Sequence, residues 1–306
     1  MWGVLAFQLP ITEAVEPPFA GAVEPPFAGA VEPPFTEAVE PPFTAVAFES
    51  SGTQVVAVSQ SGLHVHRWPS LTLAKTVPLG GINVHAVSFS PSGKMLAVGG
   101  GRPTEEGVVE VFSWPELKRV VLLDGHLDSV RAMIWKDDQR LFSASIDTDV
   151  RVWDIPRTSA PAANTDPAEN GGPPRDHTDT LLDEGSSAAR NALSVVYRGH
   201  ARSVAALALL PGGETLVSAG DDLSLRVWDV DSAKILRRMN QHTRPINALK
   251  VQPQNSGLPL IASASQDKTV RFWQPTIGRM VRYVRLDSVP LAIAWQADGA
   301  RIVAAC

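Results

Sequence analysis

The sequence predicts an all-β fold made of repeated four-stranded sheets. Short runs rich in aliphatic and β-branched residues follow one another along most of the chain and are separated by turn-forming residues. A glycine-containing turn returns at intervals of about 40 residues, and a set of Ser, Asp and Trp residues returns three times with fixed spacing. Self-similarity at such a period indicates a repeat architecture.

The segment 204–240 shows the four strands of one unit. The runs VAALALL, TLVSAG, SLRVWDV and KILRRMN each have strand composition and are separated by turns. In the sequences ESSG, SPSG, LPGG and QADG, the turn between the first two strands of a unit ends at Gly52, Gly93, Gly213 and Gly299. Glycine suits a hairpin residue with positive φ. Four strands in roughly 40–45 residues are typical of one blade of a β-propeller.

Four polar and aromatic positions recur in three of the units. In each copy Asp follows Ser by four residues, Trp follows six residues after that, and a His precedes the Trp by 27 to 31 residues. The sets are His126, Ser143, Asp147 and Trp153; His200, Ser218, Asp222 and Trp228; and His242, Ser263, Asp267 and Trp273. A catalytic site is needed once, so three copies indicate a structural role, in which each buried polar group needs a hydrogen-bond partner.

From about residue 44 to its end, the chain resembles the WD-repeat family of β-propellers, as in the G-protein β subunit. The resemblance implies that each set forms a hydrogen-bonded tetrad that braces the inner turn of a blade. The first two units keep the strand pattern and the glycine turn but lack the Asp and the matching His, and Trp68 and Trp114 are shifted from the tryptophan column. These two units are interpreted as degenerate blades.

The expected organisation is a propeller over residues 44–306, with five recognisable four-stranded blades and half of a sixth in an incomplete ring. The expected blades cover about 44–80, 81–124, 125–200, 201–240 and 241–285, with the partial blade at 286–306. Two explanations remain for the incomplete ring. Either the chain is a fragment, or residues 1–10 add a closing strand.

Two segments interrupt the strand pattern. Residues 11–43 contain AVEPPF beginning at 14, 22, 30 and 38, and its two prolines per copy exclude a helix or a central strand. We expect an extended spacer, with a ligand for a proline-recognising domain as the alternative. Residues 156–191, rich in Pro, Gly, Asp, Asn and Ser, are expected to form a disordered insertion that leaves the third blade from the face opposite the tetrads.

Composition narrows the class of protein. The net charge is −5 and no basic run exceeds two residues, which disfavours a nucleic-acid partner. The only cysteine is Cys306, so intrachain disulfides and thiolate zinc sites are excluded. No apolar stretch is long enough to span a bilayer, and no positively charged leader precedes the short apolar N-terminus. A soluble, cytoplasmic location is favoured.

Residues that resemble catalytic or ligand-binding sites have structural explanations. Three equivalent Ser–His–Asp sets argue against a hydrolase, which needs a single exposed nucleophile. The acid pairs at 147–149 and 221–222 lack the further oxygen ligands of a calcium loop. The glycines at 99–101 are not followed by a helix pattern that would bind phosphate, and we expect a loop between strands there. The sequence predicts no metal site and no cofactor.

The expected function is a non-catalytic scaffold that binds protein partners or peptide segments through its loops. By analogy with the family, the docking face lies at the tetrad turns. The exposed charged or polar residues expected to bind a partner there are Asp128, Thr148, Arg202, Asp221, Arg244, Gln266 and Lys268.

Two alternatives belong to other functional classes. One is a regulatory or sensor module of a larger enzyme, such as the cytochrome-linked bacterial WD-repeat proteins that the segment GGGRP…GVVEVFSW resembles, although this chain has no Cys-x-x-Cys-His motif. The other is a propeller enzyme or lectin, which requires converging acids or metal ligands that the sequence does not show.

Overall fold

The computed structural model describes residues 41–80, 82–156, 193–253 and 257–306. The closing strand expected at 1–10 lies outside the described residues, as do nearly all of the octapeptide repeat and of the 156–191 insertion. The described strands all belong to one compact unit, Phe43–Cys306.

The unit consists of five four-stranded antiparallel sheets and a two-stranded sixth sheet, and no helix occurs in the ranges given above. The all-β prediction of five four-stranded units and half of a sixth is therefore confirmed. The first sheet contains β1 (Ala45–Phe48), β2 (Gln54–Ser59), β3 (Gly62–Arg67) and β4 (Thr72–Val77), and the second contains β5 (Asn83–Phe89), β6 (Met95–Arg102), β7 (Glu106–Ser113) and β8 (Arg119–His126). The third contains β9 (Val130–Trp135), β10 (Arg140–Ser145), β11 (Val150–Asp154) and β12 (Leu193–Tyr197), and the fourth contains β13 (Val204–Leu209), β14 (Thr215–Gly220), β15 (Leu225–Asp229) and β16 (Ile235–Met239). The fifth contains β17 (Ile246–Val251), β18 (Ile261–Ser265), β19 (Thr269–Gln274) and β20 (Arg279–Arg285), and the sixth contains β21 (Ala292–Trp295) and β22 (Ile302–Ala305).

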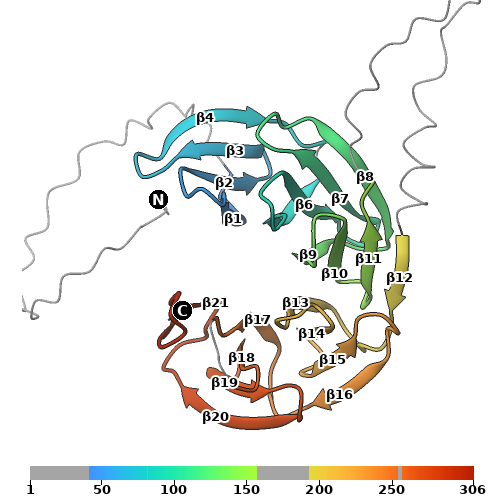
Figure 1. The fold of residues 1–306 in the computed structure, drawn as a ribbon, viewed down its shortest axis with the longest axis vertical. Coiled ribbons are helices and arrows are strands. Elements are labelled where there is room, and N and C mark those ends of the chain that lie inside the picture. Colours follow the sequence, from blue (N-terminus) through green and yellow to red (C-terminus); the bar gives the residue numbers. More distant parts are fainter. Residues whose placement is uncertain (1–40, 81, 157–192, 254–256) are drawn as a thin grey trace, which may run out of the picture. The chain divides into compact units, whose positions relative to one another are not determined.

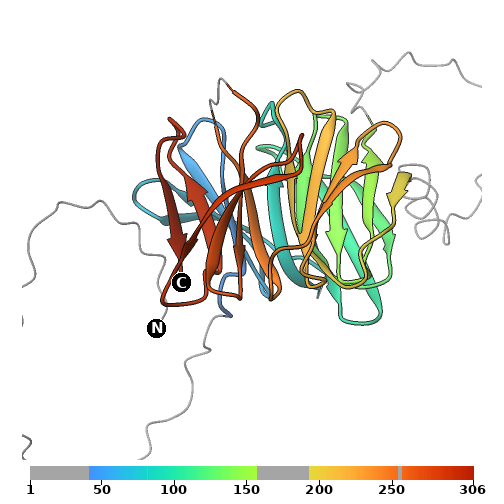
Figure 2. The same cartoon turned by 90° about the horizontal axis from the view of Figure 1, so that it is seen from below.

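The sheets follow one another around a common axis, and each of the five four-stranded sheets has its first strand innermost and its fourth strand outermost (Figure 1). The innermost strands of successive sheets contact one another, from β1 through β5, β9, β13 and β17 to β21. Figure 2 shows the same sheets from the side, with their connecting loops gathered at two opposite ends. Because every sheet has the same strand order, equivalent loops of different sheets lie at the same end.

The turns and bends of each sheet repeat as well. Gly52, Gly93, Gly213 and Gly299 have φ between +69° and +74°, which confirms the predicted turn glycines. Four of the innermost strands carry a β-bulge near their start, where one residue is left out of the pairing with the second strand. A bulge at this place increases the local twist of the innermost strand.

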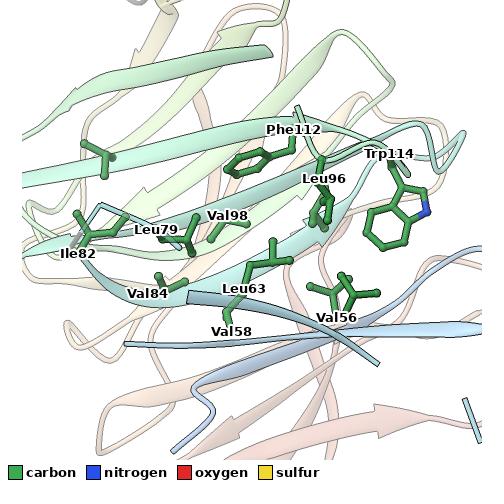
Figure 3. Close-up of a cluster of buried hydrophobic side chains, with 13 residues drawn as sticks. Val56, Val58, Leu63, Leu79, Ile82, Val84, Leu96, Val98, Phe112 and Trp114 are labelled. Carbon is green, nitrogen blue, oxygen red and sulfur yellow. The ribbon is translucent and has the colours of Figure 1, made fainter. Parts of the chain in front are cut away.

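Apolar side chains fill the space between neighbouring sheets. Figure 3 shows the cluster between the first and second sheets, where Val56, Val58 and Leu63 face Leu96 and Val98. All five side chains are fully buried. Burying an aliphatic side chain of this size stabilises a fold by about 1.5–3 kcal/mol, so each interface of this kind contributes substantially to holding two sheets together.

The expected loop at 99–101 is wrong, because these glycines lie within β6 and pair with both β5 and β7. Glycine runs usually indicate loops, but here they permit close packing of backbones. A Cβ atom on Gly100 would overlap the carbonyl oxygen of Asn83, and one on Gly107 would overlap that of Asp128. A side chain is therefore excluded at Gly100, where β6 lies against the innermost strand β5, and at Gly107 of β7, which lies against the connection between β8 and β9.

Candidate functional site

Three elements bring each tetrad together. The His lies at the end of the outermost strand of one sheet or in the connection that follows it, as His126 does at the end of β8. The Ser lies on the second strand of the next sheet, the Asp in the turn after that strand, and the Trp on the third strand. Each tetrad therefore links the outer edge of one sheet to the interior of the next.

The hydrogen bonds of the three tetrads are nearly identical. In the third sheet, the Trp153 indole N–H donates to Ser143 Oγ over 2.8 Å, Ser143 Oγ and His126 Nε2 are 2.8 Å apart, and His126 Nδ1 lies 2.8 Å from Asp147 Oδ2. In the tetrads of the fourth and fifth sheets, the corresponding distances lie between 2.6 and 2.9 Å. Every set identified by spacing in the sequence is thus brought together in space.

One protonation state satisfies every group in such a chain. Because the indole donates to Ser Oγ, the hydroxyl proton is free to be donated to His Nε2, and His Nδ1–H then donates to the carboxylate. A neutral imidazole and an ionised Asp are required for this arrangement. The tautomer is inferred from the hydrogen-bond network.

The electrostatics of the sites favour the same state. Burial is the main influence on the pKa of each tetrad histidine and lowers that pKa below its ordinary value, although the neighbouring carboxylate acts in the opposite direction. Burial alone would raise the pKa of each tetrad carboxyl, but hydrogen bonds from side chains and backbone amides outweigh it and hold that pKa below its ordinary value. At neutral pH the imidazoles are neutral and the carboxylates are charged.

Each tetrad carboxylate also fixes two loops. Asp222 accepts hydrogen bonds from the backbone N–H of Ala201, at 3.1 Å, in the connection that enters the sheet. It accepts another from the N–H of Ser224, at 3.2 Å, in the turn between the second and third strands. Asp147 and Asp267 bond the equivalent amides of their own sheets. The carboxylate therefore holds together the two loops that form one end of the sheet, which we call the tetrad end.

A fifth residue, an arginine, recurs beside each tetrad and was not among the residues predicted from the sequence. Arg151, Arg226 and Arg271 each lie two residues before the tetrad Trp and place a guanidinium 3.1–3.8 Å from the tetrad carboxylate. The signal was present in the segments VRVW, LRVW and VRFW. An arginine on a strand was overlooked because charged residues are usually solvated, whereas Arg226 is only 6% exposed.

The first two sheets lack the tetrad, and their strand register shows which residues stand in its place. By backbone pairing, His66 and Phe112 occupy the place of the tetrad Trp, and Trp68 and Trp114 lie two residues further on. These two indoles pack edge-on against aromatic rings of the first strand, Trp68 against Phe48 and Trp114 against Phe89. The polar brace is thus replaced by aromatic packing at a neighbouring position.

The seven residues expected to bind a partner all lie in the two loops of the tetrad end. Arg202, Arg244, Gln266 and Lys268 are exposed. Asp128, Thr148 and Asp221 are only partly exposed, which corrects the expectation that all seven are exposed. The partial burial arises from tight turns in which side chains lie against neighbouring backbone.

Three of the loop positions are held in place by hydrogen bonds to the backbone. Arg202 follows Ala201, whose N–H is bonded to Asp222, and Arg244 follows Thr243, whose N–H is bonded to Asp267. The carbonyl of Arg244 also accepts a hydrogen bond of 2.9 Å from Ser265 Oγ. Equivalent anchoring occurs at Asp128, whose carbonyl accepts a bond from Ser145 Oγ. Fixed backbones with solvent-facing side chains are suited to recognition.

The chemistry open to the tetrads is limited by their burial. The tetrad serines are completely buried, and each Oγ already contacts an indole and an imidazole, so none is an exposed nucleophile. Across the described ranges, no cluster of three or more His, Cys, Asp or Glu side chains is placed to hold a metal ion. A cavity of about 300 Å³ lies at the opposite end of the sheets, where Lys94, Asp138 and Gln139 contribute to its lining.

No helix in the part of the chain that the structure describes is long and apolar enough to cross a bilayer.

The sequence matches a family of repeats and several known proteins. The family model of the WD domain, G-beta repeat, matches residues 117–154, 191–229 and 233–274. These matches include the Ser, Asp and Trp of all three tetrads, together with the three arginines beside them.

Relatives match over longer stretches at low identity. Periodic tryptophan protein 2 from Saccharomyces cerevisiae is 25% identical over 268 residues, which is 82% of this chain and 28% of that protein. The anaphase-promoting complex subunit cdc20 from Dictyostelium discoideum is 25% identical over 69% of this chain and 36% of its own length. The serine-threonine kinase receptor-associated protein from Gallus gallus is 24% identical over 64% and 56%.

This chain spans less than two thirds of the length of each of these relatives. The stretches that the repeat model matches are those that carry the three tetrads described above. The chain therefore contains three repeats of the WD domain, G-beta repeat, type, within residues 117–154, 191–229 and 233–274.

Proposed function

We propose that the chain is a non-catalytic scaffold that binds a protein partner through the loops of the tetrad end. The observation that carries the proposal is the anchoring of these loops by the tetrad carboxylates, which leaves Arg202, Arg244, Gln266 and Lys268 exposed on fixed backbones. A surface that is ordered before binding loses little conformational entropy when a partner docks.

The turn between the second and third strands supports this interpretation. Thr148, Leu223 and Lys268, each directly after a tetrad Asp, have positive φ values of 76°, 67° and 62°. Non-glycine residues adopt this conformation only where surrounding contacts hold them in it. These turns therefore present their side chains in defined directions, as a docking surface requires.

The charges of equivalent positions differ between sheets and would give such a surface specificity. The residue two positions after the tetrad His is Asp128 in the third sheet, Arg202 in the fourth and Arg244 in the fifth. A partner with the complementary order of charges would be favoured over one without it. The names of two relatives, a complex subunit and a receptor-associated protein, are consistent with a role in assembly.

The test begins with selection of peptides from a random phage-displayed library by the purified chain, followed by affinity measurement with labelled synthetic peptides. The double variant Arg202→Ala/Arg244→Ala is expected to weaken binding of the selected peptides at least about tenfold, because each exposed arginine at a docking face contributes on the order of 1 kcal/mol.

The matched control is Arg67→Ala/Arg301→Ala, which removes two exposed arginines elsewhere and should change affinity less than about twofold. Thermal melting followed by circular dichroism checks that both variants fold. Failure to enrich any peptide, or equal affinity of the loop variant and the control, would contradict the proposal.

A further inference from the structure

We propose that the outer rim of the fourth and fifth sheets, formed by β16 and β20, binds an acidic, partly apolar peptide segment of another protein. This rim lies on the outer strands and meets the tetrad end only at Arg285, which pairs with Thr269 beside Lys268. The inference goes beyond the proposed docking function. Its core residues are Arg237 and Arg238 on β16 and Arg279, Arg282 and Arg285 on β20.

The charge of this region is opposite to that of the whole chain. Residues 232–286 contain ten lysines and arginines and a single acid, Asp267, whereas the chain as a whole has a net charge of −5. That acid does not neutralise the rim, because its side chain is 4% exposed and is paired with His242 and Arg271. Residues 232–286 are therefore strongly basic although the net charge of the whole chain is negative.

The structure gathers these cations on two neighbouring outer strands. Figure 1 shows β16 and β20 in succession along the outside of the fourth and fifth sheets. Arg237 Nε donates a hydrogen bond of 2.9 Å to the carbonyl of Thr276, in the turn that leads into β20, so the two strands form one continuous rim. All five arginines are exposed.

None of the five forms an ion pair within the described ranges. Arg282 lies over the Phe272 ring, 4.9 Å from its centroid, and this contact leaves its charge uncompensated. Exposed guanidinium groups of this kind gain charge-assisted hydrogen bonds when carboxylates approach them.

Protection of a sheet edge is the alternative explanation, because charged residues on outer strands discourage unwanted pairing. The other outer strands argue against it. β12 has no charged residue and β4 has only Lys75. On β8, Arg119 is paired with Glu110 at 3.6 Å. The outer strands of this molecule therefore do not need several unpaired arginines for protection. We interpret the arginines on β16 and β20 as a binding site for a ligand.

Apolar neighbours favour a peptide over a nucleic acid. Leu236, Val281, Tyr283 and Val284 are between 46% and 58% exposed. The last three lie between the arginines of β20, and Leu236 lies next to Arg237 on β16. Aliphatic side chains add favourable contacts with the apolar residues of a peptide, whereas a phosphate backbone offers no such contact. The complementary ligand is a segment in which acids alternate with apolar residues.

Fluorescence anisotropy with two labelled peptides tests the proposal. One peptide intersperses glutamate with leucine and phenylalanine, and the other replaces each glutamate by glutamine. We expect the acidic peptide to bind and its affinity to fall as NaCl rises from about 50 to about 200 mM, because the rim is exposed and its charges are screened by salt. The glutamine peptide should bind at least about tenfold more weakly.

The variant Arg279→Gln/Arg282→Gln/Arg285→Gln should weaken binding of the acidic peptide at least about tenfold. Because Arg282 covers Phe272, a second variant, Arg237→Gln/Arg238→Gln, tests the other strand without that contact and should also reduce affinity. The matched control is Arg67→Gln/Lys94→Gln/Lys118→Gln, which removes three exposed cations from the first two sheets and should change affinity less than about twofold.

Arg202→Ala/Arg244→Ala should also leave this affinity within about twofold, which separates the rim from the tetrad end. Absence of salt-dependent binding, or equal binding of both peptides, would overturn the proposal. Tighter binding of a single-stranded RNA that is lost in the rim variants would assign the rim to nucleic acid and would overturn it as well.

Discussion

Asp222 accepts hydrogen bonds from the imidazole of His200, the backbone amide of Ala201, the Ser224 hydroxyl and the Arg226 guanidinium. Its neighbour Asp221 is half-buried and its carboxylate forms no ion pair within the described ranges. The two adjacent aspartates therefore differ in how many donors their carboxylates bind. Substituting each of them by alanine tests the role of the tetrad carboxylate.

We predict that Asp222→Ala lowers the free energy of unfolding by about 3 kcal/mol or more, because it leaves a buried imidazole N–H and a buried guanidinium without their acceptor. Asp221→Ala removes the same charge and should change stability by less than about 0.5 kcal/mol. Urea denaturation followed by tryptophan fluorescence measures both. Equal effects of the two substitutions would contradict the assignment of the brace.

The tetrad residues could be predicted from sequence because their offsets recur three times. The arginine beside each tetrad recurs equally well, yet it was not predicted, since nothing in the sequence alone distinguishes a buried charged residue from a solvated one. Arg226 is buried beside a carboxylate that the fold supplies from a turn four residues earlier. That proximity depends on the hairpin geometry, which spacing along the chain does not display.

At the scale of strands, the runs 204–210, 215–220, 224–230 and 234–240 correspond closely to β13, β14, β15 and β16. They were predictable because each combines β-branched residues with well-marked turns. The glycines at 99–101 were misread for the opposite reason. A glycine-rich strand looks like a loop until the close approach of a neighbouring backbone is known, and that approach is a property of the packed sheet.

Gly220 of β14 occupies the same kind of place as Gly100 and gives a prediction at the scale of the strand. A Cβ atom there would overlap the carbonyl oxygen of Ser203, which belongs to the connection that enters the sheet. We predict that Gly220→Ala lowers the free energy of unfolding by about 2 kcal/mol, because the innermost strand must shift to make room.

Gly80→Ala is the matched control, since a Cβ at Gly80 meets no atom within 4 Å. This substitution should leave stability unchanged or raise it slightly, by restricting the unfolded chain. Thermal melting of both variants decides the question. An unchanged melting temperature for Gly220→Ala would show that the strands are not as closely packed there as the structure indicates.

At the scale of the molecule, the three buried histidines couple stability to pH. Burial holds their pKa below the ordinary value in the folded chain, so below about pH 6.5 the unfolded chain binds more protons than the folded one. Stability is therefore complete above this pH and falls as acid is added. Each histidine contributes a slope of at most about 1.4 kcal/mol per pH unit.

We predict that the free energy of unfolding falls between about pH 7.5 and about pH 5.5, as measured by urea titration at each pH. The pKa of the tetrad carboxyls is held below its ordinary value, so these groups stay ionised in this interval. Burial raises the pKa of Asp149, and this carboxyl acts on stability in the opposite sense to the histidines. The guanidinium groups that face the tetrads are those of Arg151, Arg226 and Arg271.

His85 provides the control for this prediction. It is exposed on β5, and burial together with the charge of Arg131 lowers its pKa as well. His85→Gln should retain most of the pH dependence, because the buried imidazoles carry the larger desolvation cost. Stability that stays level or rises on acidification would contradict a neutral, buried state of the tetrad histidines.

The charge distribution on the surface of the molecule is the feature that the sequence predicts least well. Runs of consecutive basic residues are short, so no local run marks the basic stretch at 232–286. Its arginines are three residues apart along β20, and only the fold shows that they share a rim with Arg237 and Arg238. A surface property needs the arrangement of strands in addition to their sequence.

Amide hydrogen exchange on Asp222→Ala, read by mass spectrometry or NMR, tests most directly whether the tetrads hold the loops of the tetrad end in place. The amides of Ala201 and Ser224, which donate to this carboxylate, should exchange faster in the variant together with the rest of their two loops. The equivalent amide of Thr243 in the fifth sheet, which donates to Asp267, should keep its protection. Unchanged exchange at Ala201 and Ser224 would contradict the account.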